Sequence, residues 1–203
     1  NQLVKAVSAT TTLEYLYDHA GKRVMKKNVT TGEVTYYVNQ YYDIVNGKPV
    51  RHVYSGDQKV ASKKKDEFIV FYVTDHLNGT TVDIDQTDKV VQVNDYYPFG
   101  SSHISEIDGE YKNGYKFTGK ELDDESGLYY YGARYYDPGV GRWVSQDSVF
   151  LSVGDEKKLK EQTGLTLEQY LKNPQHLNSY SYTLNNPLKY TDKEGEWIDA
   201  VVD

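Results

Sequence analysis

Side chains that could do chemistry are scattered along this chain of 203 residues. The five histidines, at positions 19, 52, 76, 103 and 176, lack the spacing of a zinc site, and no Gly-x-Ser-x-Gly elbow or phosphate-binding loop is present. The run from Asp83 to Asp88 lacks the turn glycine and the distal glutamate of a calcium loop, which favours a plain acidic turn. The sequence therefore predicts no metal, no cofactor and no conventional enzyme.

Charge and composition narrow the classes of partner. The net charge of −7 argues against a grip on phosphate backbones, so nucleic acid is not expected as a partner. No stretch approaches the roughly 18 apolar residues that would span a bilayer. The chain begins with Asn1 in the middle of a pattern, which suggests a piece of a longer polypeptide.

Tyrosine dominates the aromatic residues, with 21 Tyr against 5 Phe and 2 Trp. A tyrosine side chain combines an apolar ring with a hydroxyl that prefers water, so it suits sheets that are half buried or that line a hydrated cavity. The composition favours extended β-structure. A generic β-sandwich with surface tyrosines is the alternative.

Short alternating runs separated by turn residues predict successive hairpins in the first hundred residues. Asn46-Gly47 is a strong hairpin signal because both residue types tolerate positive φ. An Asp-rich bend is expected between the last two strands. The predicted strands are Leu13–Tyr17, Arg23–Val29, Val34–Tyr42, Val50–Tyr54, Gln58–Ser62, Phe68–Thr74 and Val90–Tyr97.

The composition changes after residue 100 and divides the chain into three parts. We expect a β-strip over residues 1–100, a linker loop rich in Gly, Ser and acidic residues over 101–114, and a terminal segment over 115–203. A helical insertion is expected at about 153–184. Its predicted helices are Asp155–Gln162, Leu167–Lys172 after a Thr166 cap, and Pro174 to about Leu184.

Several motifs at consistent spacing resemble one family. Leu16–Val24 resembles the YD repeat, in which a Tyr-Asp pair precedes a turn glycine and a basic residue. Phe71–Thr80 resembles the "YxxxDHLGS" segment of the same family, and Tyr96–Gly100 matches its "Y-x-P-F-G" ending. Together these motifs identify the first half as similar to RHS/YD-repeat proteins.

The second half resembles the RHS-repeat-associated core almost residue for residue. The matching stretches are Phe117–Glu121, Gly127–Pro138 and Gly141–Asp147. Asn185–Gly195 matches the closing "NNP…DPxG" of that core. The resemblance therefore covers nearly the whole chain.

The resemblance implies a mainly β fold in which an antiparallel YD-repeat strip curls into a hollow shell and a C-terminal core with a few short helices plugs one end. In bacterial members the shell encloses a C-terminal toxin, and other members are surface or adhesion proteins. We therefore expect a secreted or cell-surface, shell-forming protein. Its partners would be upstream RHS repeats of the same polypeptide and a C-terminal effector. A glycan-binding adhesion module and a self-cleaving protease are the alternatives.

The resemblance also implies a candidate catalytic trio. Toxin-type members cut themselves just beyond the closing motif with two aspartates and an arginine, which correspond here to Asp147, Asp192 and Arg134. Two close carboxylates share one proton, so the charged one activates water while the protonated one polarises the scissile carbonyl. The cut would fall near Glu196-Trp197.

The chain departs from the family pattern around this trio. Ser148 and Lys193 replace the usual prolines after the aspartates, Glu196 replaces a leucine, and residues 148–177 form an additional helical stretch. The alternative is that the aspartates cap turns and that Arg134 pairs with one of them. Likewise, the tyrosines of residues 129–131 and 135–136 favour packing over sugar stacking.

Overall fold

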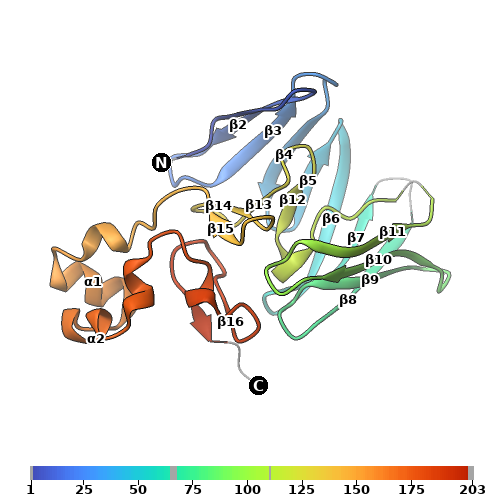
Figure 1. Cartoon of the computed structure of the whole chain (residues 1–203). Coiled ribbons are helices and arrows are strands. Elements are labelled where there is room, and N and C mark those ends of the chain that lie inside the picture. The colour runs from blue at the N-terminus through green and yellow to red at the C-terminus, as the bar shows by residue number, and fades with distance from the viewer. Residues whose placement is uncertain (1, 65–67, 110, 201–203) are drawn as a thin grey trace.

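The computed structural model describes residues 2–64, 68–109 and 111–200 and is mainly β, with a few short helices (Figure 1). The first eleven strands form one antiparallel sheet in which the spatial order follows the sequence. They are β1 (Lys5–Val7), β2 (Thr12–Tyr17), β3 (Arg23–Asn28), β4 (Val34–Asn39), β5 (Tyr42–Val45), β6 (Lys48–Ser55), β7 (Gln58–Lys64), β8 (Ile69–Thr74), β9 (Thr80–Asp85), β10 (Val90–Tyr96) and β11 (Ser102–Ile107). The mainly β, antiparallel fold predicted from the sequence is confirmed.

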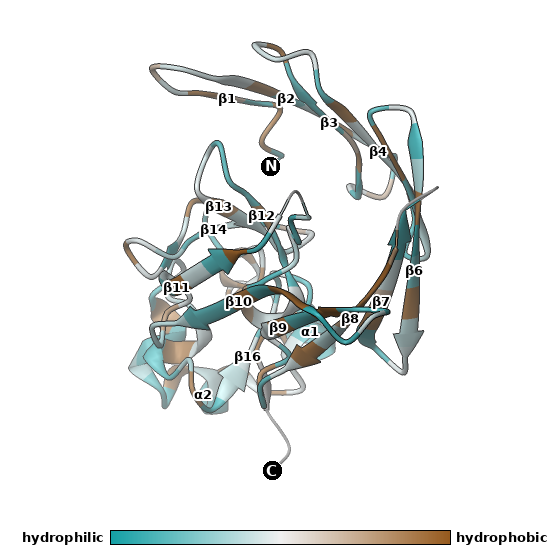
Figure 2. Ribbon diagram, turned by 90° about the vertical axis from the view of Figure 1, so that its right-hand side faces the viewer, coloured by the Kyte–Doolittle hydropathy of each residue, from teal (hydrophilic) through white to brown (hydrophobic). Residues whose placement is uncertain are grey.

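The long sheet curls around the C-terminal half of the chain (Figure 2). β1 to β4 lie on one side, β6 and β7 form the bend, and β8 to β11 return on the other side. Such curling is the accumulated right-handed twist of the strands. The sheet thereby gains a concave face, against which the second half of the chain packs.

The C-terminal half forms two small sheets and several short helical turns. β12 (Glu121–Asp123), β13 (Leu128–Tyr130), β14 (Tyr135–Asp137) and β15 (Arg142–Trp143) make an antiparallel meander. β16 (Tyr190–Thr191) and β17 (Asp199–Ala200) pair with each other. The helical elements are η1 (Phe117–Gly119), η2 (Phe150–Ser152), α1 (Glu156–Thr163), α2 (Leu167–Leu171), η3 (Pro174–Leu177) and η4 (Thr183–Asn185).

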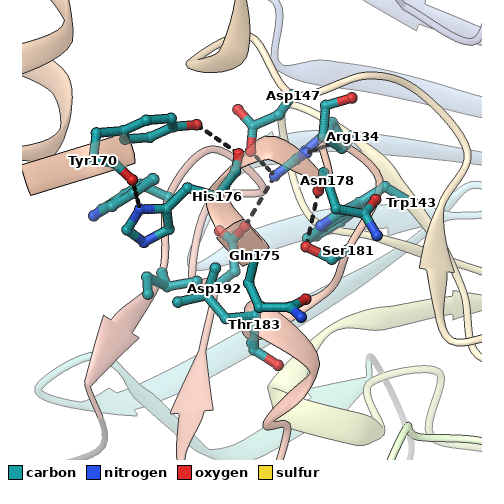
Figure 3. A pocket seen from close by; sticks show the side chains of 14 residues that line it. Arg134, Trp143, Asp147, Tyr170, Gln175, His176, Asn178, Ser181, Thr183 and Asp192 are labelled. Carbon is teal, nitrogen blue, oxygen red and sulfur yellow. Dashed lines mark hydrogen bonds and ion pairs between the residues drawn. The ribbon is translucent and has the colours of Figure 1, made fainter. Parts of the chain in front are cut away.

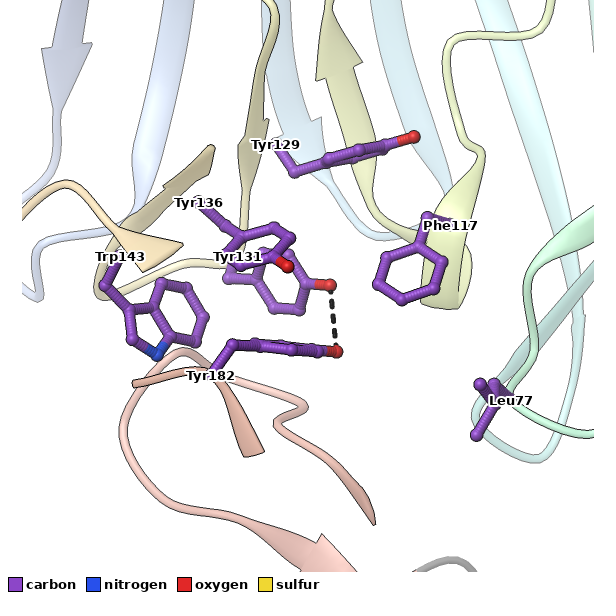
Figure 4. Packing of buried hydrophobic residues seen from close by; sticks show 7 residues of the cluster. All are labelled: Leu77, Phe117, Tyr129, Tyr131, Tyr136, Trp143 and Tyr182. Carbon is purple, nitrogen blue, oxygen red and sulfur yellow. Dashed lines mark hydrogen bonds between the residues drawn. The ribbon is translucent and has the colours of Figure 1, made fainter. Parts of the chain in front are cut away.

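Aromatic rings form the core of the C-terminal half (Figure 4). Tyr136 and Tyr182 lie with ring centroids 4.4 Å apart, and Trp143 packs edge-on against both. The Tyr131 hydroxyl bonds to the hydroxyls of Thr118 and Tyr182 at 2.6 and 3.2 Å. Because these tyrosines are buried and their hydroxyls are satisfied, their role is packing, as the sequence favoured. Tyr129 and Tyr135 are buried as well.

A buried arginine fastens the strip to the core segment. Arg23 on β3 donates to Glu121 at 2.5 Å and to Asp123 at 2.7 Å, both on β12. Its guanidinium carbon also lies 4.2 Å from the centroid of the Tyr130 ring. Lys26 contacts the same two carboxylates at 3.2 and 2.8 Å. These four charged groups form what we call the Arg23 cluster.

Two differences between the strands and the prediction lie within the first hundred residues. The run predicted as Val34–Tyr42 is divided into β4 and β5, because the Asn39 side chain accepts the Tyr41 N–H and turns the chain. The predicted Asp-rich bend contains β9, whose Asp83 faces a polar part of the interior beside Asn113. Asn46 and Gly47 do adopt positive φ between β5 and β6, as predicted.

The prediction of a linker loop over 101–114 was wrong for its first half, because Ser102–Ile107 form β11. Every residue of β11 is exposed, so no burial pattern marks it in the sequence. Within the described residues it is an edge strand that pairs with β10 alone. Composition alone cannot distinguish such a strand from a loop.

The helical stretch matches the prediction at its beginning and departs from it at its end. Asp155 caps α1, and Thr166 and Gln169 form the expected capping box of α2. The third predicted helix stops at Leu177. The following residues extend and pair with β15, where the Trp143 N–H donates to the Tyr180 carbonyl at 3.1 Å.

Candidate functional site

Arg134 is buried at the start of β14, where three neighbouring elements hold it. Its Nε donates to the Gly195 carbonyl at 2.6 Å. Its guanidinium carbon lies 4.1 Å from the centroid of the Trp143 ring, a stacking that favours the cation. The backbone nearby is tied to the closing segment because the Ala133 N–H donates to the Glu194 carbonyl at 2.9 Å. The guanidinium is therefore fixed in position and orientation.

The two candidate aspartates come from turns on either side of the helical stretch. Asp147 follows β15, and its Oδ1 accepts the Val149 N–H at 2.8 Å. Asp192 follows β16, and its Oδ1 accepts the N–H groups of Gly195 and Glu196 at 2.7 and 3.1 Å. In each side chain the second oxygen is thus left to face Arg134.

The three side chains named by the family motifs converge (Figure 3). One guanidinium nitrogen of Arg134 contacts Oδ2 of Asp147 at 3.0 Å and Oδ2 of Asp192 at 3.3 Å. This arrangement combines both sequence-based interpretations. The aspartates cap turns, and they also present two carboxylates to one cation.

Burial makes this pair of carboxylates easy to protonate. Burial raises the pKa of Asp192 to about 7, although Arg134 opposes the shift. Burial also raises the pKa of Asp147, and the carboxylate of Glu196 adds a little to that shift. Asp147 is the more exposed partner, with 19% of its side chain accessible against 2% for Asp192. Below about pH 7, Asp192 is therefore the partner that holds a proton.

A small cavity borders the two carboxylates and the closing segment. Its volume is about 30 Å³, enough for one or two water molecules. The sequence did not predict the residues that complete its wall. Tyr170 donates its hydroxyl to the His176 carbonyl at 2.8 Å, and its ring stacks on Trp197 at 6.0 Å. Among Tyr170, His176 and Trp197, only Tyr170 could have been found from the sequence, because it is an apolar position in a short helix with a capping box.

The turns that contain Ser148 and Lys193 lack the usual prolines, and other contacts order them. The Asp147 N–H donates to the Ser179 carbonyl at 3.0 Å, which fixes the turn that contains Ser148. Lys120 Nζ donates to the Lys193 carbonyl. The additional helical stretch covers the site, and its own Leu159 and Tyr170 are buried in a cluster with Val149. Hydrogen bonds and packing therefore aim the carboxylates without the usual prolines.

Two negative findings apply to the part of the chain that the structure describes. No group of three or more His, Asp or Glu side chains there is arranged to hold a metal ion. No helix among those residues is long and apolar enough to cross a membrane.

Comparison with known proteins agrees with this architecture. The chain is 32% identical to the tRNA nuclease WapA of Bacillus subtilis (strain 168) over 197 residues, covering 93% of the chain but 8% of WapA. It is 33% identical to the toxin subunit YenC2 of Yersinia entomophaga over 126 residues, covering 58% of the chain and 10% of YenC2. The chain thus spans about a tenth or less of these relatives.

Solved structures share the fold at lower identity. The crystal structure of TcdB2-TccC3-Cdc42 matches with a TM-score of 0.70 at 22% identity, covering 96% of this chain and 9% of that one. The Tc holotoxin pore of Photorhabdus luminescens matches with a TM-score of 0.71, also at 22% identity, covering all of this chain and 10% of that one. The family model described as Teneurin YD-shell matches residues 1–188. The resemblance to RHS/YD-repeat proteins is thus confirmed, and the chain is a shell-forming β domain related to toxin subunits. The chain belongs to the Teneurin YD-shell family.

Proposed function

We propose that this chain is a section of shell wall together with the segment that seals it, and that the complete protein encloses a C-terminal effector. The observation that supports this most directly is the Arg23 cluster, which fastens the core segment to the concave face of the strip. The strip also has an outer edge at β1, which pairs only with β2 within the described residues. Upstream repeats of the same polypeptide would continue the wall there.

The proposed cargo and location follow from the relatives. Two of them are named as a toxin subunit and a nuclease, and each is many times longer than this chain. A shell around a toxic effector explains why a small wall section recurs in such long proteins. We propose a secreted or cell-surface protein of that kind.

Protease protection of the cargo tests enclosure. In the full-length protein, the effector should resist digestion at protease concentrations that degrade it when it is expressed alone. Arg23→Met should open the wall and remove that protection. Arg142→Met is the matched control, because the Arg142 side chain bonds to the Asn185 side chain at the surface. Digestion of the effector at the same rate inside the full-length protein as in isolation would refute enclosure.

We also propose, as a second activity, that the Arg134 site cuts the chain between Glu196 and Trp197. The supporting observation is that Asp147 and Asp192 share one guanidinium nitrogen beside a cavity that Trp197 helps to line. Asp147, ionised and stabilised by Arg134, takes a proton from a water in the cavity. Asp192 gives its proton to the carbonyl oxygen of Glu196 as the hydroxide adds to the carbon, as in an aspartic dyad. The C–N bond to Trp197 then breaks, the Trp197 amine takes the proton held by Asp147, and the new carboxyl group of Glu196 returns a proton to Asp192.

Intact-mass measurement on a version of the chain extended by a reporter domain tests the cut. Wild-type protein should yield a fragment ending at Glu196, while Asp147→Asn and Asp192→Asn should stay whole. Cleavage should slow above about pH 7, where Asp192 loses its proton. Asp137→Asn is the control, since Asp137 also accepts a backbone N–H, from Gly139, but lies in an exposed hairpin. An uncut wild-type chain at pH 5 to 7 would leave the Arg134 site a structural clamp.

A further inference from the structure

Three polar side chains line up across neighbouring strands on the concave face of the strip. Asp43 on β5, His52 on β6 and Ser62 on β7 are each less than a tenth exposed. His52 and Ser62 are direct cross-strand partners, and Asp43 lies diagonally across from His52. His52 Nδ1 lies 2.7 Å from Ser62 Oγ, and His52 Nε2 lies 2.8 Å from Asp43 Oδ2.

The hydrogen-bond roles in this line follow from the carboxylate. An ionised Asp43 can only accept, so His52 Nε2 carries the ring hydrogen. Nδ1 then has a free lone pair, which accepts the Ser62 hydroxyl hydrogen. This is the relation of a nucleophile, a base and the group that orients the base, with the two ring nitrogens exchanged relative to the serine proteases.

Burial keeps the His52 ring neutral. Burial lowers the pKa of His52, the hydrogen bond with Asp43 opposes that effect, and the nearby Lys59 lowers it further. Glu121 on β12 acts weakly in the opposite direction. The Tyr115 ring packs edge-on against the imidazole with centroids 5.9 Å apart, which closes that side. At neutral pH the imidazole is therefore free to take a proton.

The three residues line a cavity of ligand size. Its volume is about 430 Å³, within the range of small-molecule sites. It lies between strands β3 to β8 and residues 111–125, and its rim includes the exposed Glu33, Lys112 and Asp124. Aromatic side chains form much of its wall, namely Tyr37, Phe68, Tyr72, Tyr111 and Tyr115. Acidic and basic residues are mixed around it, so it suits an uncharged guest with an aromatic or alkyl group.

We propose that Ser62 is an activated nucleophile that accepts the acyl group of small, uncharged carboxylic esters bound in this cavity. This activity is independent of the Arg134 site. Neither the sequence motifs nor the family resemblance indicates it. Ser62 lies within a strand, His52 precedes it by ten residues, and Asp43 precedes His52 by nine.

The proposed step is balanced within the three residues and the ester. Ser62 Oγ attacks the ester carbonyl while its hydrogen passes to His52 Nδ1. The ester C–O bond then breaks, and the departing alkoxide or phenolate takes that proton from His52. Water completes the cycle in the same way, giving its proton to His52 and releasing the carboxylic acid and free Ser62. Asp43 accepts throughout from Nε2–H and stabilises the transient imidazolium.

Tyr72 is placed to assist the developing negative charge on the carbonyl oxygen. Its hydroxyl interacts with Ser62 and lies 3.0 Å from the Tyr111 hydroxyl. Burial raises the pKa of Tyr72 to about 12, so the phenol keeps its hydrogen at neutral pH and can donate it. A donor at this place is what an oxyanion requires.

Acylation of the whole chain with p-nitrophenyl acetate tests the proposal. Peptide mapping should find the acetyl group on Ser62, and nitrophenol release should follow that site. His52→Gln keeps the size of the ring position but removes the base, and it should slow acetylation of Ser62 by about 100-fold. Ser62→Ala should abolish it. Ser55→Ala is the matched control, because Ser55 ends β6 in an exposed position and should leave the rate unchanged.

Other outcomes would overturn the proposal even if one variant failed to fold. In the wild-type chain, acetyl groups confined to lysines, or a Ser62 rate equal to that of Ser55, would mean that the three residues are only a cross-strand hydrogen-bond ladder. A folded His52→Gln protein with an unchanged Ser62 rate would mean the same. An alkyl fluorophosphonate reacts with activated serines but not with lysine amines, so it gives a second test on the wild-type chain. It should label Ser62, and an unlabelled Ser62 would overturn the proposal.

Discussion

Arg23 and Arg134 are both buried arginines that hold two carboxylates each, but the pKa of Glu121 beside Arg23 and the pKa of Asp192 beside Arg134 are shifted in opposite directions. Around Arg23, burial alone would raise the pKa of Glu121, but Lys26 and Arg23 together outweigh it and lower that pKa to about 2. Around Arg134, one cation serves both carboxylates, and burial raises the pKa of Asp192 to about 7. The number of cations per carboxylate distinguishes the two sites.

The number of cations per carboxylate suits the Arg23 cluster to a structural contact and the Arg134 site to chemistry. With two cations for two carboxylates, the Arg23 cluster keeps Glu121 ionised down to a pH of about 2, and tyrosine rings enclose the guanidinium of Arg23. With one cation for two, the Arg134 site must bind a proton near neutrality, and a cavity with room for water borders it. We infer that a buried arginine with acidic partners is better suited to chemistry where its carboxylates outnumber the cations.

Removal of the arginine from the balanced site should have the largest effect. Arg23→Met leaves Glu121 and Asp123 buried with Lys26 as the remaining cation of the cluster, which should cost about 3 to 5 kcal/mol of unfolding free energy. Urea unfolding at pH 7 measures this cost. Arg142→Met, at a half-exposed position, should cost less than about 1 kcal/mol. Equal losses for the two variants would remove the distinction between fastening and surface arginines.

Removal of the second cation should convert one kind of site into the other. Lys26→Met gives the Arg23 cluster one cation for two carboxylates, so the pKa of Glu121 should rise from about 2 toward that of Asp192. The loss of a buried charged contact should also cost about 1 to 3 kcal/mol. Carboxyl NMR titration follows the pKa. Lys27→Met, one residue further along β3, is the control and should leave Glu121 unshifted.

The sequence predicted the strand that carries Arg23 and Lys26, but neither β12 nor the cluster. Arg23 lies within the YD-repeat motif and starts a predicted strand, and the strand was confirmed. Its partners on β12 lie about a hundred residues away in the chain. No periodicity connects positions so far apart, because the contact exists only once the strip has curled.

More of the Arg134 site than of the Arg23 cluster was predicted, because family motifs mark Arg134, Asp147 and Asp192. What the motifs could not supply was the wall of the cavity, where Tyr170 and Trp197 meet through the additional helical stretch. The missed strands have a different cause. β9 carries the inward-facing polar residue Asp83, and β11 is exposed throughout, so neither shows the apolar alternation on which the prediction relied.

The opposite titrations predict opposite pH dependences of stability. The pKa of Asp192 lies above the value of about 4 for an unfolded aspartate, so the folded state binds the proton more tightly. Its contribution to stability therefore falls as the pH rises from about 4 through 7. The pKa of Glu121 lies below its unfolded value, so its contribution is lost as the pH falls from about 4.5 toward 2.

Asp192→Asn should remove the loss of stability that wild-type protein shows as the pH rises through 7. Its Oδ1 would still accept the Gly195 and Glu196 N–H groups, while Arg134 would pair with Asp147 alone. The variant should gain about 1 to 3 kcal/mol over wild type at pH 8 and much less at pH 5. Urea unfolding at the two pH values measures the difference. The same gain at both values would place the effect in packing rather than in titration.

The smallest expected effect concerns the departure from the family pattern beside the Arg134 site. Glu196 stands where leucine is usual, and its carboxylate contributes to the raised pKa of Asp147, after burial as the main cause. Glu196→Gln should lower the pKa of Asp147 slightly and change the unfolding free energy by less than about 0.5 kcal/mol. Carboxyl NMR titration measures the shift, and Glu194→Gln is the control from the same turn. An unchanged or higher pKa of Asp147 in the Glu196→Gln protein would mean that burial and Arg134 alone set the charge balance, without a part for the third carboxylate.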